Sequence, residues 1–239
     1  MEQSKDSLSI KLFADGADLQ GMTEMAAKPY IAGLTTNPTL MNKAGISDYV
    51  KFAKQVIKEI PNKPISFEVF SDDLNEMQSQ GEKIASWGEN VFVKIPVTNT
   101  LGISTTPVIR YLTALGVKVN VTAIMTTSQV QSTVEALNPQ YESYISVFAG
   151  RIADTGRDPV PAMKESLKIM SSNQNAKLIW ASPRELLNVF QANEIGCHII
   201  TATNDILKKL ELIGKDLDQY SLETVKMFYE DSQTAGFTL

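Results

Sequence analysis

The stretch from residue 91 to residue 121 contains one repeating unit of the fold. It opens with Val91-Phe92-Val93-Lys94-Ile95 and closes with Val117-Lys118-Val119-Asn120-Val121, two short apolar runs separated by a segment long enough for a helix. Six more runs of similar length and β-branched content are spread over the chain, at residues 10–14, 30–34, 65–70, 144–148, 176–181 and 197–201. Each of the eight runs is expected to form a β-strand.

The segments between these runs carry helical signals. After the second run, apolar side chains recur every three or four residues, at Val50, Ala53, Val56, Ile57 and Ile60. Ser47 is the expected N-cap of that helix. Pro159 and Pro183 each follow a good capping residue and are expected to open two further helices. Residues 221–239 are expected to form a last helix and tail.

Eight strands alternating with helices in 239 residues favour one closed (β/α)8 TIM barrel, a single α/β domain over residues 1–239 with an extra C-terminal helix. An open doubly wound sheet is the alternative, but no G-x-G-x-x-G motif follows the first strand. No low-complexity segment or Gly/Ser linker marks a second domain.

Composition excludes several classes of function. With 22 Lys+Arg against 27 Asp+Glu, the net charge of −5 argues against a nucleic-acid partner. No apolar run approaches the roughly 18 residues that span a bilayer, and residues 1–6 lack the apolar stretch of a signal peptide, so no membrane association and a cytoplasmic location are expected.

The chain has one cysteine and one histidine, Cys197 and His198. Ser-His-Asp hydrolysis, Cys-His catalysis and multi-histidine zinc sites are therefore improbable, and no metal is expected. Neighbours in a strand face opposite ways, so this pair is expected to serve packing. Asp72 and Asp73 are expected to cap a helix rather than bind a metal.

Lys94 lies within an apolar strand. Burial favours the neutral amine, which is the form that a Schiff-base nucleophile needs. The alternative is a lysine at an exposed strand end whose ammonium reaches water.

Polar residues at other strand ends favour the catalytic interpretation, because active sites of such barrels lie where the strands end. Glu68 is the one carboxylate of the third strand, Asp15 ends the first, and Thr35-Thr36-Asn37-Pro38 follows the second. Each alone would fit a cap or turn. In the fifth strand Lys118, Asn120 and Thr122 share a face by period two, unless the strand is bulged; Lys118 would lie lowest.

Two arginines suggest an anionic substrate. Arg151 follows the sixth strand, and Arg184 follows the seventh, two residues after Ser182 at an expected helix start. Barrels of this kind often bind phosphate near strands seven and eight at a helix N-terminus. A helix cap beside a surface arginine is the competing interpretation. Asp154 is expected to orient an arginine or to cap its loop.

Five segments carry a family resemblance: Phe13-Ala14-Asp15, Gly33-Leu34-Thr35-Thr36-Asn37-Pro38-Thr39, Val93-Lys94-Ile95-Pro96-Val97-Thr98, Asn120-Val121-Thr122 and Ser146-Val147-Phe148-Ala149-Gly150-Arg151-Ile152. With them the chain resembles the transaldolase family. The resemblance implies a (β/α)8 barrel without metal or organic cofactor. It also implies transfer of a dihydroxyacetone unit, through a lysine Schiff base, from fructose 6-phosphate or sedoheptulose 7-phosphate to erythrose 4-phosphate or glyceraldehyde 3-phosphate in the pentose phosphate pathway.

The resemblance also implies roles for individual residues. Lys94 would be the nucleophile, Asp15 the acid/base at carbon–carbon cleavage, and Glu68 with Thr122 would hold a proton-shuttling water. The substrate-binding residues would fall into two groups: Asn37, Asn120 and Ser146 on the dihydroxyacetone unit, with Thr36 and Phe148 beside them, and Arg151, Ser182 and Arg184 on the phosphate.

The family also contains fructose-6-phosphate aldolases, which release dihydroxyacetone. Glu68, Asn120 and Phe148 resemble the transferases, since the aldolases usually carry glutamine at the first position, lack the asparagine and place tyrosine at the third. Gly16 departs from the family, where serine or threonine is more common. Two alternatives remain open: such an aldolase, or a non-catalytic sugar-phosphate-binding barrel. Small chains of this family often form rings in which the C-terminal helix docks on a neighbour. Residues 221–239 could dock in this way here or could close over their own barrel; a dimer or a monomer also stays open.

Overall fold

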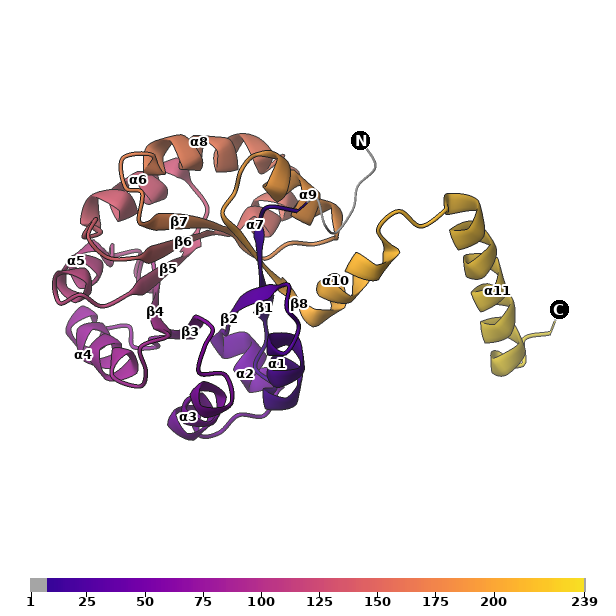
Figure 1. Ribbon diagram of the computed structural model, residues 1–239, viewed down its shortest axis with the longest axis horizontal. Helices are drawn as coiled ribbons and strands as arrows, with labels where there is room; N and C mark the ends of the chain where they lie inside the picture. Colours follow the sequence, from indigo (N-terminus) through magenta and orange to yellow (C-terminus); the bar gives the residue numbers. More distant parts are fainter. Residues whose placement is uncertain (1–7, 239) are drawn as a thin grey trace.

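The computed structural model describes residues 8–238. The polar N-terminal residues 1–6 and Leu239 lie outside that range. Eight parallel strands form a closed barrel in the order β1 to β8, each hydrogen-bonded to its neighbours in sequence, with β8 returning to β1 (Figure 1). The predicted (β/α)8 barrel is therefore confirmed.

The strands are β1 (Lys11–Asp15), β2 (Ile31–Thr35), β3 (Ile65–Glu68), β4 (Val91–Pro96), β5 (Val119–Ile124), β6 (Ser143–Val147), β7 (Ala176–Trp180) and β8 (Ile199–Thr203). The helices are α1 (Leu19–Ala26), α2 (Pro38–Lys43), α3 (Tyr49–Glu59), α4 (Leu74–Ala85), α5 (Thr106–Ala114), α6 (Thr127–Ala136), α7 (Ala149–Asp154), α8 (Val160–Met170), α9 (Leu187–Glu194), α10 (Asn204–Lys208), a 3₁₀ turn η2 (Lys209–Leu212) and α11 (Leu217–Ala235). All eight predicted strands are present, although the fifth and eighth begin two residues later than predicted.

Aromatic side chains fill the barrel interior at its lower end, which is the end where the strands begin. Phe92 and Tyr144 stack with ring centroids 4.0 Å apart, and Phe13 packs edge-on against Tyr144 at 5.8 Å. A Cβ on Gly33 would lie 2.5 Å from the Phe13 ring, so glycine at this position leaves the ring its space. These rings close the floor of the barrel.

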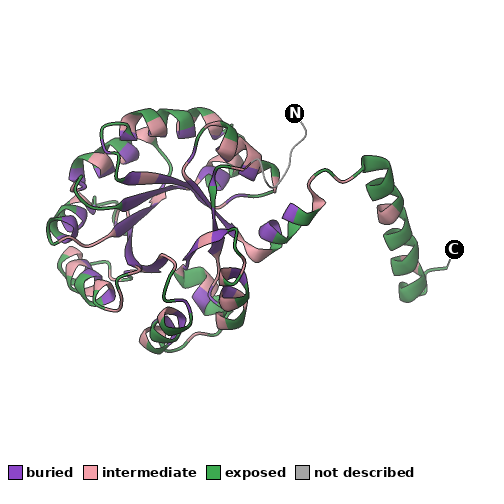
Figure 2. Cartoon of the chain, in the orientation of Figure 1, coloured by how far each residue is buried: buried purple, intermediate pink, exposed green. Residues whose placement is uncertain are grey.

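The alternation of side chains along each strand determines which residues lie above this floor, because side chains two residues apart share a face. Asp15 follows Phe13 on the inner face of β1, and Lys94 follows Phe92 on that of β4. Outward-facing residues such as Val93 and Ile95 are buried under the helices, so the strands are buried almost throughout (Figure 2). The alternating pattern of the strands thus places polar groups at the carboxyl end of the barrel.

Two of the predicted helix starts are wrong. Asp48, not Ser47, caps α3, because its carboxylate accepts a hydrogen bond from the Lys51 N–H. Pro183 does not open α9, which begins at Leu187. Ser182 has a φ of 58°, in the left-handed region, so the chain turns there instead of entering a helix.

The predicted terminal helix is present as α11, but it begins at Leu217, where the Asp216 carboxylate accepts from the Gln219 N–H. The helix stands away from the barrel (yellow in Figure 1) and contains no buried residue (Figure 2). It does not close over the mouth of its own barrel. No helix within residues 8–238 combines the length and apolarity that a membrane crossing requires.

Candidate active site

A cavity of about 490 Å³ opens at the carboxyl ends of the strands. Ten of the twelve site residues expected from the sequence line it: Asp15, Asn37, Glu68, Lys94, Thr122, Ser146, Phe148, Arg151, Ser182 and Arg184. The other two, Thr36 and Asn120, are fully buried in its wall. The barrel therefore brings residues from seven different strands or the loops after them to one place.

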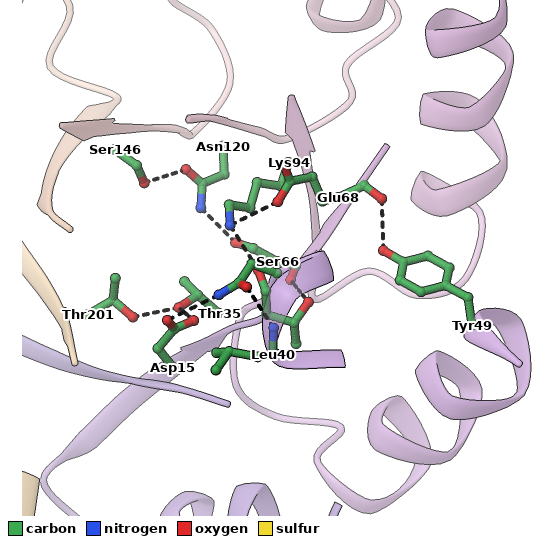
Figure 3. Close-up of polar contacts among 12 residues, drawn as sticks. Asp15, Thr35, Leu40, Tyr49, Ser66, Glu68, Lys94, Asn120, Ser146 and Thr201 are labelled. Carbon is green, nitrogen blue, oxygen red and sulfur yellow. Dashed lines mark hydrogen bonds and ion pairs between the residues drawn. The ribbon is translucent and has the colours of Figure 1, made fainter. Parts of the chain in front are cut away.

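Lys94 is buried, with 6% of its surface exposed. Its Nζ lies 3.0 Å from Glu68 Oε2 and donates a hydrogen bond of 2.9 Å to the Thr36 carbonyl (Figure 3). Glu68 and Lys94 are register partners on β3 and β4, which explains why the carboxylate meets the amine. The Tyr49 hydroxyl donates to the Glu68 carbonyl and anchors the end of β3. A lysine and a proton acceptor are thus held in contact.

Asp15 lies at the end of β1, in the same cavity. Thr35 Oγ1 donates to its Oδ1 at 2.8 Å, and Asn37 Nδ2 approaches its Oδ2 at 3.4 Å. The Asn37 amide is oriented by Leu40, whose N–H donates to Asn37 Oδ1. Burial raises the pKa of the Asp15 carboxyl, while Lys94, Thr35 and Asn37 lower it. The balance favours a carboxyl that can exchange protons.

Asn120 belongs to a buried chain of hydrogen bonds behind the cavity. Its Nδ2 donates to Ser66 Oγ at 2.9 Å, and its Oδ1 accepts from Ser146 Oγ at 2.7 Å (Figure 3). Asn120 is fully buried and does not line the cavity, although it is the register partner of Lys94. Thr36 is likewise fully buried, and its hydroxyl donates to the Ser66 carbonyl.

The end of β5 is irregular. Its pairing with β6 shifts register between Val121 and Ile124, and Ala123 has a φ of 61°. The bulge that the sequence left open is therefore present, just beyond Thr122. The buried Thr122 Oγ1 lines the cavity and has no hydrogen-bond partner among the described residues. Lys118 lies at the lower end, with its Nζ 5.5 Å from the Phe92 ring centroid and bonded to the Glu89 carbonyl.

The two arginines lie at the rim. Arg184 forms a two-point ion pair with Asp154, and this pairing lowers the pKa of the Asp154 carboxyl. Asp154 thus orients an arginine, as one of the two expectations had it. Arg184 lies in the loop before α9 rather than at a helix start, so the expected dipole of a helix beginning at Pro183 does not act on it.

Gly150 and Ser182 come very close at this rim. A Cβ on Gly150 would lie 1.6 Å from the Ser182 carbonyl oxygen. Only glycine allows α7 to begin against the loop after β7 in this arrangement. The contact holds Arg151 of α7 and Arg184 of that loop at one rim.

The structure adds residues that sequence reasoning did not single out as site residues. Thr35 and Thr201 line the cavity, and Ser66 supports it from below. Period-two counting along β8 from Ile199 would have placed Thr201 on the inner face. Its contact with β2 follows only from closure of the barrel.

Cys197 and His198 lie away from the cavity, as predicted. The Cys197 thiol is buried, and burial raises its pKa to about 12. His198 Nδ1 accepts from the Leu178 N–H, and burial lowers the pKa of its imidazole. Asp73 caps α4 as predicted, since its carboxylate accepts from the Glu76 N–H. Among residues 8–238 no group of three or more His, Cys, Asp or Glu side chains is arranged to hold a metal ion.

Comparison with known proteins extends the resemblance over the whole barrel. The sequence profile of the family described as "Transaldolase/Fructose-6-phosphate aldolase" matches residues 12–239. The chain belongs to this family.

Curated relatives agree. A probable transaldolase of Thermoanaerobacter sp. (strain X514) is 31% identical over 96% of this chain and all of its own length. Probable transaldolases of Sulfurihydrogenibium sp. (strain YO3AOP1) and Listeria monocytogenes are each 34% identical over 84% of this chain and 88% of their own. All three relatives are named as probable transaldolases, which is one of the two activities in the family's description.

Among solved structures, a putative dihydrodipicolinate synthase family protein from Coccidioides immitis has a TM-score of 0.60 at 12% identity. The match covers 99% of this chain and 79% of that one. At this identity the likeness concerns the barrel fold alone.

Proposed function

We propose that this member of the family is a transaldolase. It would move a dihydroxyacetone unit from a ketose phosphate, fructose 6-phosphate or sedoheptulose 7-phosphate, to an aldose phosphate such as erythrose 4-phosphate or glyceraldehyde 3-phosphate. The observation that carries the proposal is the buried Lys94, whose Nζ meets Glu68 in a cavity shared with Asp15. A binding module gains nothing from a buried lysine.

The first half of the reaction is Schiff-base formation. Lys94 Nζ attacks the ketose carbonyl carbon, and the carbinolamine then loses its oxygen as water to leave an iminium. Glu68, 3.0 Å from Nζ, is placed to exchange the protons that these steps move, directly or through a water held by the unpaired Thr122 hydroxyl.

The second half is cleavage and transfer. The Asp15 carboxylate accepts the proton of the ketose C4 hydroxyl as the C3–C4 bond breaks, and the bonding electron pair passes into the iminium to form an enamine. The aldose phosphate leaves. When the enamine attacks the acceptor aldehyde, Asp15 returns the proton to the new hydroxyl and the iminium forms again. Water then adds to this iminium, and the carbinolamine collapses to release the product ketose and free Lys94, so water and protons balance over the cycle.

Substrate orientation follows from the remaining cavity groups. The proton of Ser146 is committed to Asn120 Oδ1, so Ser146 offers its lone pairs to a substrate hydroxyl. Arg151 and Arg184, with the Ser182 hydroxyl, supply cationic and hydrogen-bonding groups for the phosphate at the rim. These local charges would counter the net charge of −5 of the whole chain.

Phe148 favours transfer over release. Its ring lines the cavity 5.9 Å from the Arg151 guanidinium carbon and brings no acid to protonate an enamine. An enamine that is not protonated persists until an acceptor aldehyde arrives. Glu68, rather than the glutamine of the aldolases, is consistent with the same assignment.

The test is an assay of fructose 6-phosphate consumption with and without erythrose 4-phosphate, combined with borohydride trapping. A transaldolase consumes the ketose only with the acceptor, and borohydride adds a reduced dihydroxyacetone unit to Lys94, located by mass spectrometry. Lys94→Met should abolish both results. Lys118→Met is the matched control, because Lys118 is also in the barrel but lies at its lower end.

Other outcomes would overturn the proposal. Free dihydroxyacetone formed without acceptor would assign the protein as an aldolase. Phosphate-dependent binding that survives Lys94→Met, with no ketose consumed by the parent protein, would assign a non-catalytic barrel. An adduct on another lysine would contradict the mechanism.

We further propose that copies of the chain associate through α11. Leu222, Val225 and Tyr229 lie on one face of this helix and are 47%, 60% and 66% exposed. Helices in proteins draw most of their stability from packing such a face, and α11 buries no residue in its own chain. A second copy of this chain is the partner we propose for it.

A further inference from the structure

A chain of hydroxyl groups joins Thr201 of β8 to Asp15 of β1 (Figure 3). Thr201 Oγ1 lies 2.5 Å from Thr35 Oγ1, which in turn lies 2.8 Å from Asp15 Oδ1. Since β1 pairs with β2 on one side and β8 on the other, the chain crosses the inner face of β1. Thr201 lines the cavity and is 6% exposed.

The direction of these hydrogen bonds follows from counting protons. An ionised carboxylate can only accept, so the single hydroxyl proton of Thr35 goes to Asp15. The short contact between the two hydroxyls then requires Thr201 to donate to Thr35. Hydrogen bonds aligned in this way polarise one another, which strengthens the last bond to the carboxylate.

We propose that Thr201 is a positioning residue for Asp15: its hydroxyl keeps the Thr35 proton on Oδ1 and thereby leaves Oδ2 to face the substrate. The inference deepens the proposed function and rests on it for the role of Asp15 as acid/base. Asp15 Oδ2 has one hydrogen bond among the described residues, from Asn37 Nδ2 at 3.4 Å. It is therefore the oxygen left to accept the substrate proton.

The surroundings of Asp15 separate this effect from direct charge effects. From β4, the Lys94 ammonium lowers the pKa of Asp15, and β2 contributes the neutral Thr35 and Asn37. Arg151 and Arg184 line the same cavity from α7 and the loop after β7, and Glu68 lies against Lys94. Thr201 carries no charge, so its removal leaves all these charges in place.

The experiment compares Thr201→Val, which keeps the shape and removes the hydroxyl, with Thr201→Ser, which keeps the hydroxyl. For Thr201→Val we expect kcat to fall about fivefold, as the loss of one hydrogen bond implies, with KM for the ketose changed less than about twofold. The ionised carboxylate loses support, so the acid limb of the kcat/KM profile moves to higher pH. Thr201→Ser should restore kcat and the acid limb.

A matched control is Thr133→Val on α6. Thr133 is also buried, and its hydroxyl donates to the Gln129 carbonyl within the same helix. This variant should keep the parent kcat and pH profile even if its melting temperature falls. The Thr201 proposal is overturned if Thr201→Val keeps the parent kcat and acid limb, or if Thr201→Ser is as impaired as Thr201→Val.

A second measurement does not depend on activity and so separates failure of this inference from failure of the proposed function. Thr201→Val should lower the melting temperature more at high pH, where the ionised form of Asp15 is more populated, than at acid pH. In an Asp15→Asn background that pH dependence should vanish. If it persists there, the hydroxyl chain does not act on Asp15. If it vanishes while the parent shows no turnover, the positioning of Asp15 stands and only the transaldolase assignment fails.

Discussion

Asp15 shows at the scale of one residue how a site trades stability for reactivity. Burial raises the pKa of its carboxyl above the ordinary value of 3.8. The neutral carboxyl is therefore favoured by folding, and the stability it contributes is present below that value and lost as the pH rises through the raised pKa. Ionisation of the buried carboxyl therefore lowers the free energy of unfolding as the pH rises.

Asp15→Asn should consequently stabilise the protein at pH values above the raised pKa, by about 1.4 kcal/mol for each unit by which the pKa is raised. Turnover should fall by about 10²–10⁴-fold, because the acid/base is removed. Thermal melts between about pH 3 and pH 8 check the sign, since the gain should shrink toward acid pH. An equal gain at all pH values would contradict the linkage to ionisation.

Phe148 is the residue at which transfer and release are expected to diverge. Phe148→Tyr would add a hydroxyl acid to the cavity, and we expect release of free dihydroxyacetone without acceptor to rise about tenfold or more. Phe148→Leu is the control, because it removes the ring without adding the acid. Enzymatic detection of dihydroxyacetone measures both, and no gain for tyrosine over leucine would rule out this role.

At the scale of elements, the rim depends on how closely α7 approaches the loop after β7. Gly150→Ala would place a Cβ 1.6 Å from the Ser182 carbonyl oxygen, so backbone must shift. We expect a loss of stability of about 1–3 kcal/mol and a raised KM for the phosphorylated substrate, because Arg151 and Arg184 separate.

Gly16→Ala is the matched control for that substitution. A Cβ on Gly16 would meet Met22 Cγ at 3.7 Å, an ordinary contact. Urea unfolding and KM should both stay near the parent values. The same variant shows whether the family's larger residue at this position is compatible with the present Asp15 geometry. If Gly150→Ala also leaves KM unchanged, the close approach does not organise the phosphate site.

At the scale of the whole molecule, α11 is the part that the barrel does not explain. If copies associate through it, the parent protein should elute and scatter light as a multiple of the chain mass. Val225→Glu should shift it toward the monomer, because a charge then enters the buried contact. Thr234→Glu adds the same charge at an exposed position on the opposite side of the helix and should leave the assembly intact. A monomeric parent would refute the proposal.

Much of the barrel and its site could be predicted because both follow from short-range periodicity. Lys94 follows Phe92 and Asp15 follows Phe13 by two residues, so the alternation that fills the barrel floor also places polar groups above it. The predicted helix start at Pro183 was wrong for a local reason. Ser182 has a left-handed backbone conformation, which the Ser-Pro sequence does not indicate, and the chain turns there before the helix begins.

The number and order of the strands, the closed barrel and most of the polar groups at its mouth could be predicted from the sequence. Which of these groups reach the cavity, and which act through others, depends on the folded barrel. Asn120 is held in the wall by Ser66 and Ser146, and Thr201 meets Thr35 although 166 positions separate them. The physical reason is that such contacts depend on strand register and on the return of β8 to β1, which no local pattern encodes.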